Sequence, residues 1–111
     1  GALVVYTEGP AKITNVTFEN IELHQSDKYP INVTVGDNSK AQISDLTFKN
    51  IMIGGKNKVR ICNRSTVGGA INGISFENCL RDEKEVTSSR VLNVLVSNVN
   101  ESNIQVVWNQ P

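Results

Sequence analysis

The amino-acid sequence predicts an all-β protein, a right-handed parallel β-helix of about three to four coils. Three observations support this fold. One short segment recurs along the chain, further short apolar runs lie between its copies, and the composition favours pleated backbone. The 111 residues include 14 Val and 10 Ile but only 4 Ala, together with 14 Asn. Because Val and Ile favour strands while Asn favours turns, the composition argues against a helical bundle.

The recurring segment follows one template: aliphatic, two variable positions, aliphatic, variable, aromatic or Val, variable, Asn, aliphatic. Four segments fit it, with starts 30, 28 and 20 residues apart: 13–21, 43–51, 71–79 and 91–99. Repeats of about 20 to 50 residues are typical of solenoids, in which each repeat adds one coil. We therefore expect residues 1–111 to form a single β-helix domain. An ordinary β-sandwich would show hydrophobic runs at closer spacing without this long repeat.

A second set of short strands is expected between the template segments, at 3–6, 31–35, 59–62 and 104–108. Turn residues such as Gly9-Pro10 and Gly36-Asp37-Asn38 separate the two sets. Strand alternation directs the aliphatic side chains of the first three short strands inward. The outward positions are then Val4, Tyr6, Asn32, Thr34, Arg60 and Cys62, a face without carboxylates.

Stacked coils place equivalent residues in columns about 4.8 Å apart. Phe18, Phe48 and Phe76 share one template position and are expected to stack inside the solenoid. Four asparagines share another position, where the chain bends at a strand end: Asn20, Asn50, Asn78 and Asn98. Asn tolerates left-handed backbone, and stacked amides bond one another. We interpret this row as a turn-forming ladder in preference to a ligand site.

Charge and hydropathy exclude some partners. Eleven basic and eleven acidic residues give a formal net charge of zero, which does not favour nucleic acid or an anionic membrane. No apolar run approaches the roughly 18 residues of a membrane span.

Glu19, Lys49 and Glu77 share a register, which favours cross-strand charge pairing over a catalytic acid pair. Residues 80–90 break the repeat and are predicted to form a solvated surface loop or short helical turn.

The segments Ile13–Ile21, Ile43–Ile51 and Gly73–Asn78 resemble recurring coils of the right-handed β-helix enzymes of the pectate-lyase-like superfamily. They are most similar to the final coils of the polygalacturonase-like glycoside hydrolases, family 28. The resemblance covers most of the chain. It implies a carboxy-terminal portion of a longer β-helix that acts on pectin or a related polysaccharide.

The catalytic patterns of family 28 are absent from this chain. Those enzymes carry Asn-Thr-Asp, Asp-Asp, Gly-His-Gly and Arg-Ile-Lys; here only Val59-Arg60-Ile61-Cys62 echoes the last, with Cys62 in place of Lys. Hydrolysis of a glycosidic bond needs two carboxyl groups across the sugar. We therefore assign no catalytic residue and expect no hydrolase activity from this chain alone. The resemblance implies that the catalytic coils lie upstream.

Four residues are the candidate sugar contacts: Tyr6, Tyr29, Arg60 and Arg64. Aromatic faces stack on sugar rings, and Arg binds carboxylates through two parallel hydrogen bonds. For Tyr29, a role in packing the turn before Pro30 is the competing interpretation. Trp108 is interpreted as a cover for the open end of the coil stack.

Metal, redox and cofactor chemistry have no support in the sequence. His24 is the single histidine, in a loop with Asp27, and lacks further ligands at metal spacing. Cys79 is expected to point inward and Cys62 outward, which argues against a disulfide. We therefore predict no metal and no cofactor.

Two functional hypotheses remain from the sequence. The leading one is a carbohydrate-active β-helix, the carboxy-terminal part of a polygalacturonase-like glycoside hydrolase. The alternative is a non-enzymatic surface, adhesion or glycan-binding module. Asn-x-Ser/Thr matches at Asn15, Asn32, Asn63 and Asn100 hint at a secreted or extracytoplasmic location. The polar caps that repeat proteins need are missing before Leu3, so we expect the first coil to stack on preceding coils or on a second copy.

Overall fold

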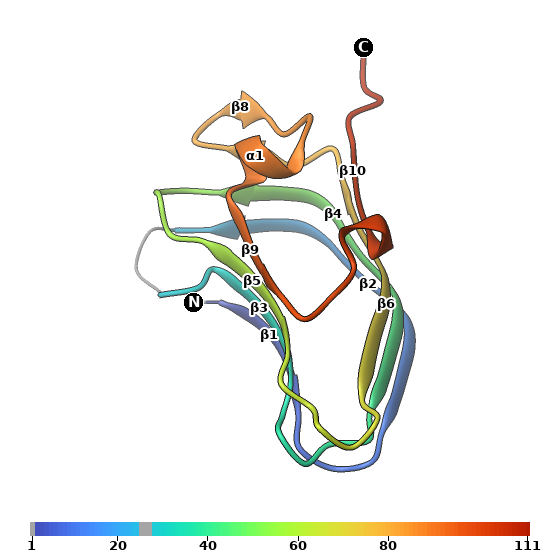
Figure 1. Ribbon diagram of the computed structural model, residues 1–111. Helices are drawn as coiled ribbons and strands as arrows, with labels where there is room; N and C mark the ends of the chain where they lie inside the picture. Colours follow the sequence, from blue (N-terminus) through green and yellow to red (C-terminus); the bar gives the residue numbers. More distant parts are fainter. Residues whose placement is uncertain (1, 25–27) are drawn as a thin grey trace.

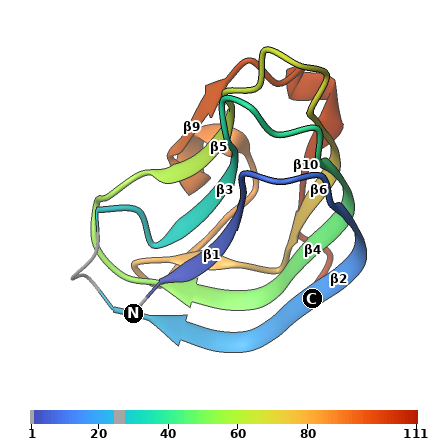
Figure 2. The same cartoon turned by 90° about the horizontal axis from the view of Figure 1, so that it is seen from below.

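The chain forms a β-solenoid of about four turns built from two parallel sheets, which confirms the predicted parallel β-helix. The computed structural model describes residues 2–24 and 28–111. The two sheets face each other across the interior and are joined at one end by stacked turns, at the bottom of Figure 1; Figure 2 shows the coils from that end. We name them the short-strand sheet and the long-strand sheet.

The short-strand sheet contains β1 (Leu3–Thr7), β3 (Ile31–Val35), β5 (Val59–Asn63) and β9 (Val94–Ser97), in that order. The long-strand sheet contains β2 (Lys12–Leu23), β4 (Gln42–Ile53), β6 (Ala70–Glu77) and β10 (Ile104–Val107), also as neighbours. The long-strand sheet also includes β7 (Leu80–Arg81), which pairs with β4, and β8 (Lys84–Glu85), which pairs with β7. Helix α1 (Ser89–Leu92) and a 3₁₀ turn (Glu101–Asn103) complete the described elements.

The predicted phenylalanine column lies at the centre of the core. The rings of Phe18 and Phe48 stack with centroids 5.3 Å apart, and those of Phe48 and Phe76 with centroids 5.1 Å apart. The parallel register places Phe18 beside Phe48 and Phe48 beside Phe76. Identical rings stack because each coil repeats the template in the same register.

The asparagine row bends the chain at strand ends, as predicted. Asn20, Asn50, Asn78 and Asn98 all have left-handed backbone, with φ between 52° and 58°. The Asn50 amide donates to Asn20 Oδ1 at 2.6 Å, which is one rung of the expected ladder. A second column of left-handed residues, at Asn15, Asp45 and Gly73, was not predicted. Its signal is an Asn, Asp or Gly at the third template position.

The fourth template match was placed in the wrong sheet. Residues 94–97 of that segment form β9, which pairs with β5, and Asn98 donates to the backbone oxygen of Asn63. The long-strand sheet is instead continued by β10, whose Ile104 pairs with Ile74, 30 residues earlier in the chain. Leu80 and Arg81 still pair with Met52 and Ile53 of β4, and the chain then leaves the coil before it returns as β9. Counting from the template alone therefore misplaced the last two strands.

The excursion was expected to be a solvated loop or helical turn, and it is more ordered than that. It contains the antiparallel hairpin β7–β8 and the single turn α1, which lie at the top of Figure 1. Ser88 caps α1 by accepting from the Val91 N–H. Arg81 and Val86 are buried, so part of the excursion packs against the coils.

The hairpin turn stores backbone strain at Glu83. Asp82 and Glu83 have φ of 47° and 66°, as a two-residue hairpin turn requires, and Gly is the residue best suited to such positions. We expect Glu83→Gly to raise the free energy of unfolding by about 0.5–1 kcal/mol, because Glu83 is exposed and makes this conformation at a steric cost. Urea unfolding measures the change. Glu83→Ala keeps the Cβ atom and is the control; a gain as large as that of Glu83→Gly would contradict the strain.

The first coil is less buried than the others. Leu3, Val5, Val16 and Phe18 are half-buried, whereas Val33 and Phe48 in the next coil are fully buried. Within the described part of the chain, β1 and β2 each have a neighbouring strand on one side only. Stacking of this end on further coils or on a second copy stays a prediction.

Both cysteines are free and buried. Cys79 lies in the core as predicted, and its Sγ contacts the Phe48 backbone oxygen at 3.4 Å. Burial raises the pKa of the Cys79 thiol. Cys62 occupies an outward position yet is only 5% exposed.

None of the helices in the described ranges is a candidate membrane span.

Candidate functional site

The outer face of the short-strand sheet carries the sequence-predicted contact residues. Its two rows of outward side chains follow from the strand register: Val4, Asn32, Arg60 and Leu95, then Tyr6, Thr34, Cys62 and Ser97. Val4, Tyr6 and Leu95 are exposed. As predicted, neither row contains a carboxylate.

Tyr29 and Arg60 form a pair at the amino-terminal end of this face. The Arg60 guanidinium lies over the Tyr29 ring, with its Cζ atom 5.2 Å from the ring centroid. Lys28 Nζ lies 5.5 Å from the same centroid. Arg60 Nη2 also approaches Cys62 Sγ at 3.6 Å, so the Arg60 side chain runs along β5 and explains why the outward Cys62 is covered. A cation over an aromatic face is attracted by the ring quadrupole, which holds the guanidinium in place.

Tyr6 and Arg64 belong to a second group, at the opposite end of the same strands. Together with Glu8, Asp37 and Asn38 they line a hollow of about 330 Å³, which we name the turn cluster. The Tyr6 hydroxyl donates to Glu8 Oε1, and this hydrogen bond is the main reason that the pKa of Tyr6 is raised. Arg64 Nε pairs with Asp37 Oδ1 at 3.0 Å.

The stacked turns bring the turn cluster together. The Gly36 N–H donates to Thr7 O, and the Arg64 N–H donates to Val35 O, both at 2.8 Å, so the three chain segments leave the sheet in register. A Cβ atom on Gly36 would lie 3.0 Å from Glu8 Cγ. The missing side chain of Gly36 thus leaves space for Glu8 beside Asp37.

The four candidate residues therefore form two pairs on one side of the solenoid. Tyr29 lies with Arg60, and Tyr6 with Arg64. Glu8 and Asp37 were not predicted from the sequence, because they lie in the turns that follow the strands and not at strand positions. The signal was present: Asp37 and Arg64 lie 27 residues apart, close to one repeat.

The turn cluster is suited to binding and lacks the features of a hydrolytic pair. Both carboxylates are exposed, one in an ion pair with Arg64 and the other bonded to a tyrosine hydroxyl. A general acid in a glycosidase needs surroundings that keep its carboxyl protonated, which burial usually supplies. Exposed carboxylates and a guanidinium are instead ready hydrogen-bond partners for sugar hydroxyls.

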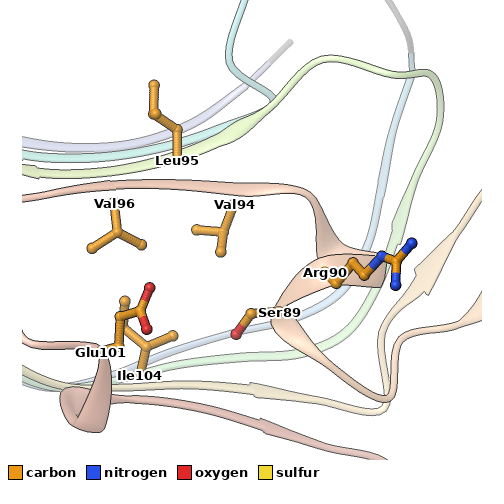
Figure 3. Close-up of a pocket in the computed structure, with 7 residues that line it drawn as sticks. All are labelled: Ser89, Arg90, Val94, Leu95, Val96, Glu101 and Ile104. Carbon is orange, nitrogen blue, oxygen red and sulfur yellow. The ribbon is translucent and has the colours of Figure 1, made fainter.

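A further hollow, of about 400 Å³, opens between β9 and β10, at the end of the coil stack opposite to β1 and β2. Val94, Val96 and Ile104 point into it with Glu101, whereas Leu95 points to the opposite side of β9 (Figure 3). These side chains continue the apolar interior, so this hollow is the open end of the last coil. Trp108 is not among the residues that line it, so the predicted cover finds no support there.

No metal centre is present in the described part of the chain: no group of three or more His, Cys, Asp or Glu side chains there is placed to hold an ion. His24 follows β2 and lines a small hollow with Glu22 and Glu83. Its proposed neighbour Asp27 lies outside the described residues.

Comparison with protein-family models, with curated proteins and with solved structures found no match to this chain.

Proposed function

We propose that the chain binds polysaccharide on the outer face of its short-strand sheet, as the carboxy-terminal part of a secreted, polygalacturonase-like β-helix. The observation that carries the proposal is the Tyr29–Arg60 pair, which presents an aromatic ring and an oriented guanidinium on this face. Arg recognises the carboxylate of an acidic sugar through two hydrogen bonds, and aromatic rings pack on sugar rings. The resemblance of the repeat to family 28 coils supports pectin as the substrate class.

The two ends of the face differ in charge, which gives the bound glycan a direction. Among the described residues, two cations, Lys28 and Arg60, lie at the Tyr29 ring. The turn cluster has two carboxylates and one guanidinium, so it carries one net negative charge. We therefore place a uronate at Arg60 and uncharged hydroxyl groups at Glu8 and Asp37. Arg60 and Arg64 are four residues apart along the chain, or about 13 Å of strand, which suits an oligosaccharide.

A titration with oligogalacturonate tests this placement. We expect the ¹H–¹⁵N signals of the Asn32 and Arg60 region to shift with saturation. Arg60→Gln should weaken binding about tenfold or more, because it removes a charge-assisted hydrogen bond. Lys49→Gln, on the long-strand sheet, makes the same change in charge and should leave the affinity unaltered. Equal affinities for the two variants would refute the site.

The alternative, a non-enzymatic adhesion or glycan-binding module, is favoured by two observations. The carboxylates nearest the face are exposed and already paired, and the four family 28 motifs are absent. Incubation with polygalacturonate should release no reducing ends from this chain alone. A longer protein that includes the upstream coils separates the two hypotheses. If these coils carry the Asp-Asp and Gly-His-Gly motifs, the longer protein should hydrolyse polygalacturonate. If they are only further Asn-ladder coils, it should bind the polysaccharide without hydrolysing it.

A further inference from the structure

A basic hollow of about 690 Å³ lies beside the excursion and shares no residue with the Tyr29–Arg60 pair or the turn cluster. Four basic side chains line it, from Lys56, Arg81, Lys84 and Arg90, against the single carboxylate of Asp82. The chain as a whole has no net charge, so this is a local excess of three positive charges. Glu83 and Glu85 belong to the same hairpin but do not line the hollow.

Arg81 distinguishes this hollow from a patch of surface lysines. Its side chain is 6% exposed, and its Nη1 is buried without a hydrogen-bond partner among the described residues. Its Nη2 donates to the Asn57 backbone oxygen. Burial lowers the pKa of Arg81, while Asp82 acts in the opposite direction. A guanidinium nevertheless stays charged. The wall of the hollow therefore contains a charged side chain, Arg81, one of whose nitrogens makes no hydrogen bond with the described residues.

The Asp82 carboxylate does not supply the missing hydrogen-bond partner of Arg81 Nη1. Its Oδ1 accepts from the Gly55 N–H at 2.8 Å, which ties the hairpin to the coil below. No ion pair within 4.0 Å joins Asp82 to the basic side chains of the hollow in the described ranges. The Arg90 side chain points away from the space between β9 and β10 (Figure 3), and it lines the basic hollow.

We propose that this hollow binds an oxyanion, with Arg81 at its base and Lys56, Lys84 and Arg90 around its rim. The rim cations would hold the incoming oxygens through charge-assisted contacts, and the Arg81 guanidinium, whose buried Nη1 has no partner among the described residues, would add its positive charge from the base of the hollow. The excess of three positive charges favours a doubly charged sulfate or phosphate group over a single carboxylate. The group can be a free inorganic ion or a substituent of an anionic glycan.

The test titrates the protein with sodium sulfate, sodium phosphate and a sulfated oligosaccharide, against sodium chloride at matched ionic strength. We expect saturable ¹H–¹⁵N shifts at Gly55, Asn93 and the Arg81 side chain. Tighter binding of the oligosaccharide than of inorganic sulfate would assign the glycan source, and equal or weaker binding the free ion. Chloride should compete only through screening.

Variants of the rim test the site without disturbing the core. Lys84→Gln and Arg90→Gln should each weaken sulfate binding about two- to fivefold, and the double variant about tenfold. Lys49→Gln is again the matched control. Sulfate binding should also raise the Tm of the parent protein, and Arg81→Met should abolish this rise. If Arg81→Met does not fold, the affinities of the Lys84 and Arg90 variants test the proposal. Absence of saturable binding, or a double variant that binds as tightly as the parent, overturns the proposal.

Discussion

Phe48→Ala is expected to lower the free energy of unfolding by about 3–5 kcal/mol, the usual loss for a large buried aromatic side chain. Phe48 is fully buried and is the central ring of the column, stacked on Phe18 on one side and on Phe76 on the other. Its removal opens a cavity and ends both stacking contacts. Since small domains are stable by only about 5–15 kcal/mol, this variant should be close to unfolding. Urea denaturation followed by circular dichroism measures the loss.

Phe18→Ala is the matched comparison for this prediction. Phe18 has the same ring in the same column, but it is half-buried and stacks on one neighbour. Its loss of stability should be clearly smaller than that of Phe48. Equal losses would show that the column does not act as a continuous core, and the fold assignment would lose its main energetic support.

Gly69→Ala is expected to lower the free energy of unfolding by about 3 kcal/mol, at the upper end of the cost of overpacking. A Cβ atom at Gly69 would lie 2.6 Å from Ser39 O, 2.7 Å from Val35 Cγ1 and 2.8 Å from Ser65 Cβ. Ser39 O belongs to the backbone of the neighbouring turn and cannot rotate away. The same turn is held by hydrogen bonds from the Gly69 N–H to Ser65 Oγ and from Ser65 Oγ to Ser39 O.

Gly9→Ala controls for the change in backbone entropy. Gly9 lies in the equivalent turn of the first coil, and a Cβ atom there meets nothing within 4 Å. We expect its stability to stay within about 0.5 kcal/mol of the parent. Thermal unfolding of both variants gives the comparison. A Gly69→Ala protein as stable as Gly9→Ala would mean that the turns are packed less closely than the structure shows.

The candidate site was only partly predictable. Tyr6, Tyr29, Arg60 and Arg64 were chosen for their chemistry, and the two pairs that they form could not be deduced from spacing. Tyr29 meets Arg60 because the segment before Pro30 lies near β5, a contact between parts of the chain 31 positions apart in number. Glu8 joins Asp37 and Arg64 because three successive turns leave the sheet in register.

The basic hollow shows the same limit. Residues 80–90 look like a solvated charge run, because a sequence does not say which member of such a run packs inward. The sheet decides this: β7 pairs with β4 so that Arg81 takes the position next to the buried Ile53, while Lys84 stays exposed. The pairing of β7 with β4, and not the composition of the segment, therefore buries this arginine.

The all-β parallel solenoid, the phenylalanine column and the left-handed bends at Asn20, Asn50, Asn78 and Asn98 could all be predicted from the sequence. Each of these depends on a residue type recurring once per coil, and stacking turns such a period directly into contacts. The sheet to which each of the last two strands belongs, the pairing of the contact residues and the burial of Arg81 required the three-dimensional structure. The strand assignment depends on where the excursion leaves and rejoins the coil, and the contact pairs depend on how the turns and the segment before Pro30 pack. Arg81 is buried because β7 pairs with β4 at the position of Ile53.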